Sequence, residues 1–301
     1  MNKKSTLPIL YHGGFYGTYL EWCLTMLTTD APLVAPFTDK GNSHNFRSGH
    51  FLEGIDGWSS YVDSLNQWDF VRLHPKVNIT DNVQQNLDKI SSQVNYFVYI
   101  YPTDKSFLLV LNNHFTKVWE DWWNHAFLGN QIDKDVIYNN WPSMQNIAIE
   151  ETPQWIKREF LSYYMMPMWI DQIAWNHPNH YNQSNCLLVR IEDILYNIKN
   201  TVSDIISRSK VIQTKSVEVL EPYHDQMLGI QVNLEQDTLC RKILDSITNQ
   251  TTFDWQNQNL PLASEAYIQW ELRNRRLEMR CDGLDKFPTS SVQLKELLYP
   301  V

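Results

Sequence analysis

The sequence of 301 residues is long enough for one large domain or two small ones, and its 43% hydrophobic and 20% charged residues are typical of a globular chain with a sizeable core. Its formal net charge of −9 argues against a general nucleic-acid-binding protein, which needs a basic face to displace the counterions of phosphates. A small basic site for an anionic ligand remains compatible with this charge. No stretch approaches the length of a membrane-spanning helix, so no membrane span is expected.

The cysteines and the first residues of the chain indicate a reducing compartment. Four cysteines are present, and none has a neighbour at the spacing of a metal-binding or redox pair: Cys23, Cys186, Cys240 and Cys281. The basic residues at the start are followed too soon by Pro8 and Gly13 for a secretion signal. We therefore expect a cytoplasmic protein that holds no metal.

The first half of the chain alternates short apolar runs with segments of helical period. In chain order, the expected elements are a strand at 7–11, a helix at 18–28, an irregular polar segment at 31–64, a strand at 69–73, a helix at 81–91 and a strand at 96–100. The run at 96–100 is apolar or aromatic throughout, as expected of a central parallel strand.

The second half is more helical. The expected elements are helices at 105–127 and 153–175, a strand at 186–191, a helix at 194–207 and, after residue 216, helical segments near 235–248 and 264–279. Strand–helix alternation of this kind predicts an α/β fold with a parallel sheet that helices cover on both faces. Because no linker is visible, we expect residues 1–301 to form a single domain with a helical extension after about residue 215.

A glycine-rich turn joins the first strand to the first helix. Backbone N–H groups in such a turn, together with the helix N-terminus, can bind an anion, and glycines let the backbone approach the anion closely. The candidate ligand-binding residues are His12, Gly13, Gly14, Phe15, Tyr16, Gly17, Thr18 and Tyr19. The turn lacks the Gly-Lys-Ser/Thr of a Walker A motif. A tight strand-to-helix turn without a ligand is the open alternative.

This turn resembles the first loop of the sulfotransferases that use PAPS (3′-phosphoadenosine 5′-phosphosulfate) as donor. Their loop has the form Pro-Lys-Ser-Gly-Thr-Thr-Trp after the first strand, and Gly17 and Thr18 match its Gly-Thr. The family's lysine, which helps to neutralise the phosphosulfate, falls on Phe15. The resemblance implies a P-loop, nucleotide-binding, sulfotransferase-like α/β fold in which the turn holds the 5′-phosphosulfate.

A second match lies at the end of the second expected strand. Arg72-Leu73-His74-Pro75 is similar to the family's Lys-Thr-His-Leu-Pro, in which the histidine is the general base. A hydroxyl attacks sulfur poorly until its proton is being removed, and imidazole has a suitable pKa. The resemblance thus implies that His74 is the base, and Arg72 is a permanent cation suited to sulfate oxygens. The alternative for His74 is a structural histidine beside a proline turn.

Two further matches follow. Tyr101-Pro102-Thr103-Asp104-Lys105-Ser106 resembles the family's Arg-Asn/Asp-Pro-Arg-Asp, whose arginine and a later serine hold the donor's 3′-phosphate. Ile100 stands at the arginine position, so Lys105 and Ser106 are the candidates for the 3′-phosphate. The alternative is a solvated Lys105 with Thr103 as the N-cap of a helix. The segment from Arg190 to Ile194 is similar to the family's Arg-Tyr-Glu-Asp-Leu, which is structural.

The resemblance implies an enzyme that moves a sulfuryl group from PAPS to a hydroxyl of a small molecule or carbohydrate. The family's late Arg-Lys-Gly segment is not visible, and the candidates to replace it form a late basic patch: Arg273, Arg275 and Arg276. The alternative for this patch is a solvated helix face that pairs with Glu271 and Glu278. The rival hypothesis is a binding or assembly protein that keeps the fold without catalysis. A kinase that uses ATP is the weakest alternative, because the Walker lysine is absent.

Overall fold

The computed structural model describes most of residues 6–30, 51–53, 70–74, 83–103 and 183–231, together with single positions elsewhere up to residue 270. The chain divides into two compact units, each made of two segments. The first unit comprises Met1–Phe107 and Gln172–Val232, and the second comprises Leu108–Asp171 and Asn233–Val301. Whether the two units form one domain, as the sequence analysis expects, stays a prediction.

A parallel sheet forms the centre of the first unit, which confirms the expected α/β class. Its strands are β1 (Leu7–Leu10), β2 (Phe51–Glu53), β3 (Phe70–His74), β4 (Phe97–Tyr101) and β5 (Cys186–Arg190). They lie in the order β2-β3-β1-β4-β5, and every pairing among them is parallel. All four residues of β1 are buried, as expected of a strand with a neighbour on each side and helices over both faces.

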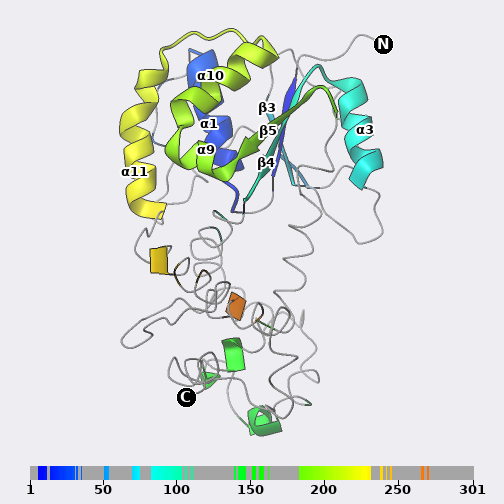
Figure 1. The fold of residues 1–301 in the computed structure, drawn as a ribbon, viewed down its shortest axis with the longest axis vertical. Coiled ribbons are helices and arrows are strands. Elements are labelled where there is room, and N and C mark those ends of the chain that lie inside the picture. The colour runs from blue at the N-terminus through cyan, green and yellow to red at the C-terminus, as the bar shows by residue number, and fades with distance from the viewer. Residues whose placement is uncertain are drawn as a thin grey trace. The chain divides into compact units, whose positions relative to one another are not determined.

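Helices cover the two faces of this sheet. Helix α1 (Gly17–Thr28) contacts β1 and β3 on one face, and α3 (Val83–Gln93) lies on the other (Figure 1). The connection from β1 runs toward the β2 edge, whereas the connection from β3 runs toward the β5 edge. Right-handed crossovers in opposite directions place their helices on opposite faces, which is the arrangement seen here.

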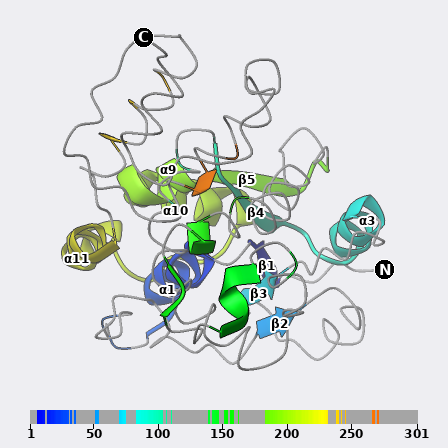
Figure 2. The ribbon, with the colours of Figure 1, turned by 90° about the horizontal axis from the view of Figure 1, so that it is seen from below.

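Three further helices lie on the same side of the sheet as α1, as both ribbon views show (Figures 1 and 2). They are α9 (Ile191–Tyr196), α10 (Ile198–Ser209) and α11 (Glu221–Gln231), the last preceded by the short 3-10 helix η7 (Val217–Leu220). Helix α10 contacts α1, and η7 connects α10 with α11.

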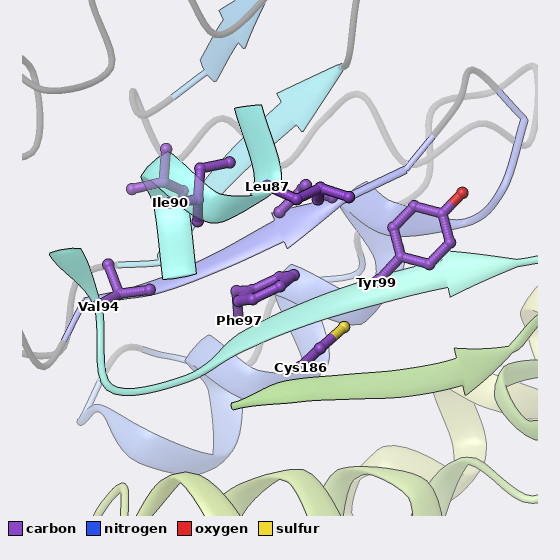
Figure 3. Packing of buried hydrophobic residues seen from close by; sticks show 8 residues of the cluster. Leu87, Ile90, Val94, Phe97, Tyr99 and Cys186 are labelled. Carbon is purple, nitrogen blue, oxygen red and sulfur yellow. The ribbon is translucent and has the colours of Figure 1, made fainter. Parts of the chain in front are cut away.

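The core between α3 and the sheet is made of side chains that approach from both layers (Figure 3). Leu87 and Ile90 of α3 stand at helical spacing and are almost fully buried. They pack with Phe97 and Tyr99 of β4, which alternate with residues that point to the other face. The same cluster also contains Leu10, Val71, Val94 and Cys186.

The C-terminal end of α1 is closed by a distant segment of the chain. The backbone N–H groups of Thr214 and Lys215 donate to the carbonyl of Leu27 at 2.8 and 3.2 Å, and the hydroxyl of Thr214 also donates to it at 3.1 Å. These bonds satisfy the carbonyl oxygen of Leu27, one of those that the last turn of a helix leaves without intrahelical partners. The connection between α10 and η7 therefore fixes one end of α1.

Two expected elements differ from the structure. Strand β2 lies inside the segment expected to be irregular, where three residues pair with the edge of β3. The single helix expected at 194–207 is two helices, α9 and α10, separated at Asn197, whose φ of −146° and ψ of 36° are not helical. The hydroxyl of Thr201 donates to the carbonyls of Asp193 and Asn197 at 3.0 and 2.9 Å and so bridges this break.

The expected helices at 105–127 and 153–175 and the late helical segments fall largely outside the described residues. In the second unit the structure describes the 3-10 helix η3 (Pro142–Asn146), a helical stretch at 156–158 and a stacked aromatic pair, Tyr267 and Trp270, with ring centroids 6.0 Å apart. Among the described helices, none is long and apolar enough to cross a membrane.

Candidate anion-binding site

The turn between β1 and α1 lies where the strand connections of the sheet diverge. β1 and β4 are neighbours, but the chain leaves β1 for the β2 edge and leaves β4 for the β5 edge. Between two such strands, the connections move apart at the carboxyl ends and leave a crevice, where open α/β sheets bind their ligands. Topology alone therefore points to this turn as the place for a ligand.

The backbone of the turn departs from the conformations that most residues prefer. Gly14 has a φ of 86°, and Tyr16, the N-cap residue of α1, has a φ of 61° in the left-handed region. For a side chain such as that of tyrosine this conformation costs about 1–2 kcal/mol. Left-handed residues within a turn help to gather successive N–H groups on one side, which is the geometry of anion-binding backbone nests.

Gly17 has a steric role at the start of α1. A Cβ atom at this position would lie 2.1 Å from Cδ1 of Tyr11, because the tyrosine ring rests against the glycine backbone. The hydroxyl of Tyr11 lies 3.1 Å from Oγ1 of Thr18, at hydrogen-bond distance. The Gly-Thr pair singled out in the sequence thus forms a packed unit with Tyr11, a contact that the motif did not predict.

The side chains of the turn are mostly buried. Phe15 and Tyr19 are each 1% exposed, and Tyr16 is 9% exposed. Phe15, which stands at the sulfotransferase lysine position, is therefore a core residue. Residues His12 and Gly13, also expected to bind ligand, lie outside the described residues.

The two predicted catalytic residues lie on β3, the strand next to β1. Arg72 pairs in register with Ile9, within the strand, and His74 is the last residue of β3. His74 follows the pair of Leu10 with Leu73, so its backbone is level with Tyr11, the residue before the turn. The structure thus brings His74 and the turn to the same edge of the sheet. Arg72 lies two residues before the end of β3. The side chains of Arg72 and His74 are not among those described.

At the end of β4, the predicted phosphate contact Ser106 belongs to a helix cap. Its side chain is 1% exposed, and its Oγ accepts a hydrogen bond from the backbone N–H of Thr103 at 3.0 Å, as the fourth residue of a capping box does. The hydroxyl of Thr103 donates to a carboxylate oxygen of Glu192 in α9. Glu192 belongs to the segment that is similar to the family's structural motif. This segment therefore holds the end of β4 in place. Lys105 lies outside the described residues.

The ends of β4 and β5 form a charged corner beside this cap. Tyr101 pairs in register with Arg190, whose guanidinium donates to both carboxylate oxygens of Asp193 at 2.8 and 2.6 Å. The hydrogen bond and the charge of Asp193 raise the pKa of Arg190, and burial raises the pKa of Tyr101. With Glu192 adjacent, this corner carries two carboxylates and one cation. Its net negative charge disfavours phosphate binding, so the corner has a structural role.

A histidine that the sequence analysis did not single out contacts the first turn of α1. Nδ1 of His224 in α11 lies 3.0 Å from the hydroxyl of Tyr19. The sequence around His224 does not predict this contact, because the two residues lie 205 positions apart. Among the described residues, no group of three or more His, Cys, Asp or Glu side chains has the geometry to hold a metal ion.

No known protein family and no curated protein matches the sequence of this chain.

Proposed function

We propose that the protein binds a nucleotide that carries phosphate and sulfate at the turn between β1 and α1, and transfers a sulfuryl group from PAPS to a hydroxyl acceptor. One observation supports this above the others. The turn that resembles the sulfotransferase loop lies at the point where the connections of a parallel sheet diverge, and it opens a 12-residue helix.

In this proposal, the backbone of residues 12–18 holds the 5′-phosphosulfate, and His74 takes the proton of the acceptor hydroxyl. The bond between sulfur and the bridging phosphate oxygen breaks while the acceptor oxygen bonds to sulfur, which leaves adenosine 3′,5′-bisphosphate. Arg72 stabilises the negative charge that spreads over the sulfuryl oxygens, as in other group transfers governed by electrostatics. Lys105 contacts the 3′-phosphate, and the acceptor is a small molecule or a carbohydrate.

A second candidate is a protein that binds the nucleotide or a partner without catalysis. The buried Phe15 favours it, because a core phenylalanine supplies no charge where the sulfotransferases have lysine. The hydroxyl of Ser106 favours it as well, since it already accepts a hydrogen bond from the backbone of Thr103. A non-catalytic protein that binds the nucleotide would use the same turn and differ from the enzyme only in turnover.

Calorimetric titration with adenosine 3′,5′-bisphosphate tests the nucleotide site that the enzyme hypothesis requires. We expect micromolar affinity, about −8 kcal/mol. Arg72→Ala removes the cation beside the 5′-phosphate that the sulfuryl group leaves behind, and is expected to weaken binding roughly 10- to 100-fold. Lys89→Ala is the matched control, because Lys89 lies on the exposed side of α3 and its loss removes one positive charge as well. Absence of binding by the folded wild-type protein would contradict the proposal.

Turnover separates the two candidates. Because a general base contributes about 10²- to 10⁴-fold, His74→Ala is expected to bind the nucleotide normally and to lose sulfuryl transfer to that extent. The measurement is transfer of labelled sulfate from PAPS to a panel of small alcohols and sugars. Nucleotide binding with no transfer to any acceptor would favour the non-catalytic protein.

A further inference from the structure

The imidazole of His224 joins three helices of the first unit. From α11 it reaches the hydroxyl of Tyr19 in α1 through Nδ1, at 3.0 Å, and the carbonyl of Leu195 in α9 through Nε2, at 2.9 Å. Tyr19 lies in the first turn of α1, directly after Thr18. One side chain of α11 therefore contacts both the helix that follows the anion-binding turn and the helix that follows β5.

The two contacts determine the protonation of the ring. A carbonyl oxygen can only accept, so Nε2 of His224 carries the proton and donates to Leu195. In the neutral ring, Nδ1 then accepts the hydrogen bond of the Tyr19 hydroxyl. A second proton turns Nδ1 into a donor, so the Tyr19 hydroxyl would have to accept and to rotate its own proton toward another acceptor.

The surroundings of the ring are mostly apolar and aromatic. Tyr19 is 1% exposed, and its ring stacks at 6.0 Å on His224 and at 5.8 Å on Trp22. Trp22 in turn contacts Tyr223 edge to face, at 5.2 Å between centroids. One face of the half-buried imidazole therefore packs on an aromatic ring and not on water.

Few described polar groups act on the ring. From α1, the groups are the hydroxyl of Tyr19 and, bonded to Tyr19, the thiol of Cys23; from α9, the Leu195 carbonyl; from α11 itself, the carboxylate of Asp225. Burial lowers the pKa of His224, while the Leu195 carbonyl and Asp225 oppose that shift without cancelling it. The folded protein therefore prefers the neutral ring.

We propose that His224 is a pH-sensitive latch, which holds α11 against α1 and α9 while its ring is neutral and loosens α11 when the ring takes up a proton. Helix α11 is the last element of the first unit, and the chain enters the second unit at Asn233. The latch thus controls the attachment of the helix that leads into the second unit. This inference does not depend on the proposed nucleotide.

The direction of the pH effect follows from the lowered pKa of His224. When α11 is released, the ring titrates near its ordinary pKa of about 6.5, and when α11 is attached it titrates at a lower pH. The contribution of the latch is therefore complete above about pH 6.5 and is lost as the pH falls below that value, until the attached ring is protonated too. The loss amounts to about tenfold in the attachment equilibrium for each unit of difference between the two pKa values.

Hydrogen–deuterium exchange of the whole protein tests the latch. We expect the protection of the α11 amides, relative to those of α10 and after correction for the intrinsic rate, to fall severalfold between pH 7.5 and 5.5. In His224→Asn, an amide oxygen can still accept from Tyr19 but does not titrate, so the ratio is expected to stay constant. A constant ratio in the wild type, or an equal fall in His224→Asn, would overturn the proposal.

A second measurement needs no variant. Nuclear magnetic resonance of labelled histidine, assigned to His224 through its contact with the Tyr19 ring, reports both the tautomer and the titration midpoint in the folded protein. We expect a proton on Nε2 alone at pH 7.5 and a midpoint below 6.5. A midpoint above 6.5, or a proton on Nδ1 alone, would contradict the latch.

Discussion

At the scale of single residues, the candidate site depends on contacts that reach beyond its motif. The motif predicts that Gly17 lets the backbone approach an anion closely, but the structure gives Gly17 a steric role beneath the ring of Tyr11. The motif places Phe15 where the sulfotransferases have lysine, and the structure shows Phe15 as part of the core. Nothing in the sequence around His224 predicts its contact, because its partner Tyr19 lies 205 positions away. Sequence spacing predicts the chemistry of a turn but cannot show which distant side chains pack on it.

Substitution of Gly17 by alanine tests the steric role. The new Cβ would lie 2.1 Å from the ring of Tyr11, which must move and give up its contact with Thr18. We expect the free energy of unfolding, measured with urea, to fall by about 1–3 kcal/mol, as in other overpacked sites.

The matched control is Gly229→Ala, in the last turn of α11. A Cβ atom there would meet nothing within 4 Å. Alanine is preferred over glycine within helices, so we expect a gain of about 0.5–1 kcal/mol. Equal effects of the two substitutions would contradict the role assigned to Gly17.

At the scale of elements, the spacing of apolar residues predicts the strands and helices that pack against one another. The strands β1, β3, β4 and β5 and the helices α1 and α3 lie within two residues of the ranges expected from the sequence. Strand β2 was missed because three residues carry no measurable alternation and form a strand only by pairing with β3. The sequence does not predict the break at Asn197, because apolar residues continue across it. The hydrogen bond from Thr201 to the Asp193 carbonyl, which bridges the break, is a tertiary detail that the hydrophobic pattern does not contain.

The apolar face of α3 offers a test at this scale. Leu87 is 2% exposed and packs on the sheet, whereas Lys89 of the same helix is exposed. Leu87→Ala removes buried contacts and leaves a cavity, so we expect a loss of about 2–5 kcal/mol in the free energy of unfolding by urea. Lys89→Ala is expected to change it by less than about 0.5 kcal/mol. Comparable losses in both variants would show that α3 does not pack as described.

At the scale of the whole molecule, the two units are interleaved along the chain. The first unit needs residues up to 107 and again from 172 to 232, and the second takes the segments between and after them. The sequence predicts a single domain with a helical extension after about residue 215, since no visible linker marks the points where the chain passes from one unit to the other. The boundaries between the units depend on tertiary contacts, which cannot be predicted from the spacing of apolar residues within single elements.

Truncation distinguishes between the two segments of the first unit. A chain that ends at residue 171 lacks β5, α9, α10 and α11, so the sheet loses a strand and α1 loses its contact with α10. We expect its α1 amides to exchange hydrogen without protection. A chain that ends at residue 232 keeps every described element of the first unit and is expected to protect α1. Equal protection in both fragments would show that the late segment is dispensable for α1.

The pairing of β4 with β5 also determines when the sheet can be completed in the cell. Residues 108–171 leave the ribosome between these two strands, and at roughly 5–20 residues per second their synthesis takes several seconds. During that interval β4, which is apolar or aromatic throughout, presents an unpaired strand edge on the nascent chain. Such an edge readily joins other chains. Newly made protein should therefore need a chaperone until β5 has emerged.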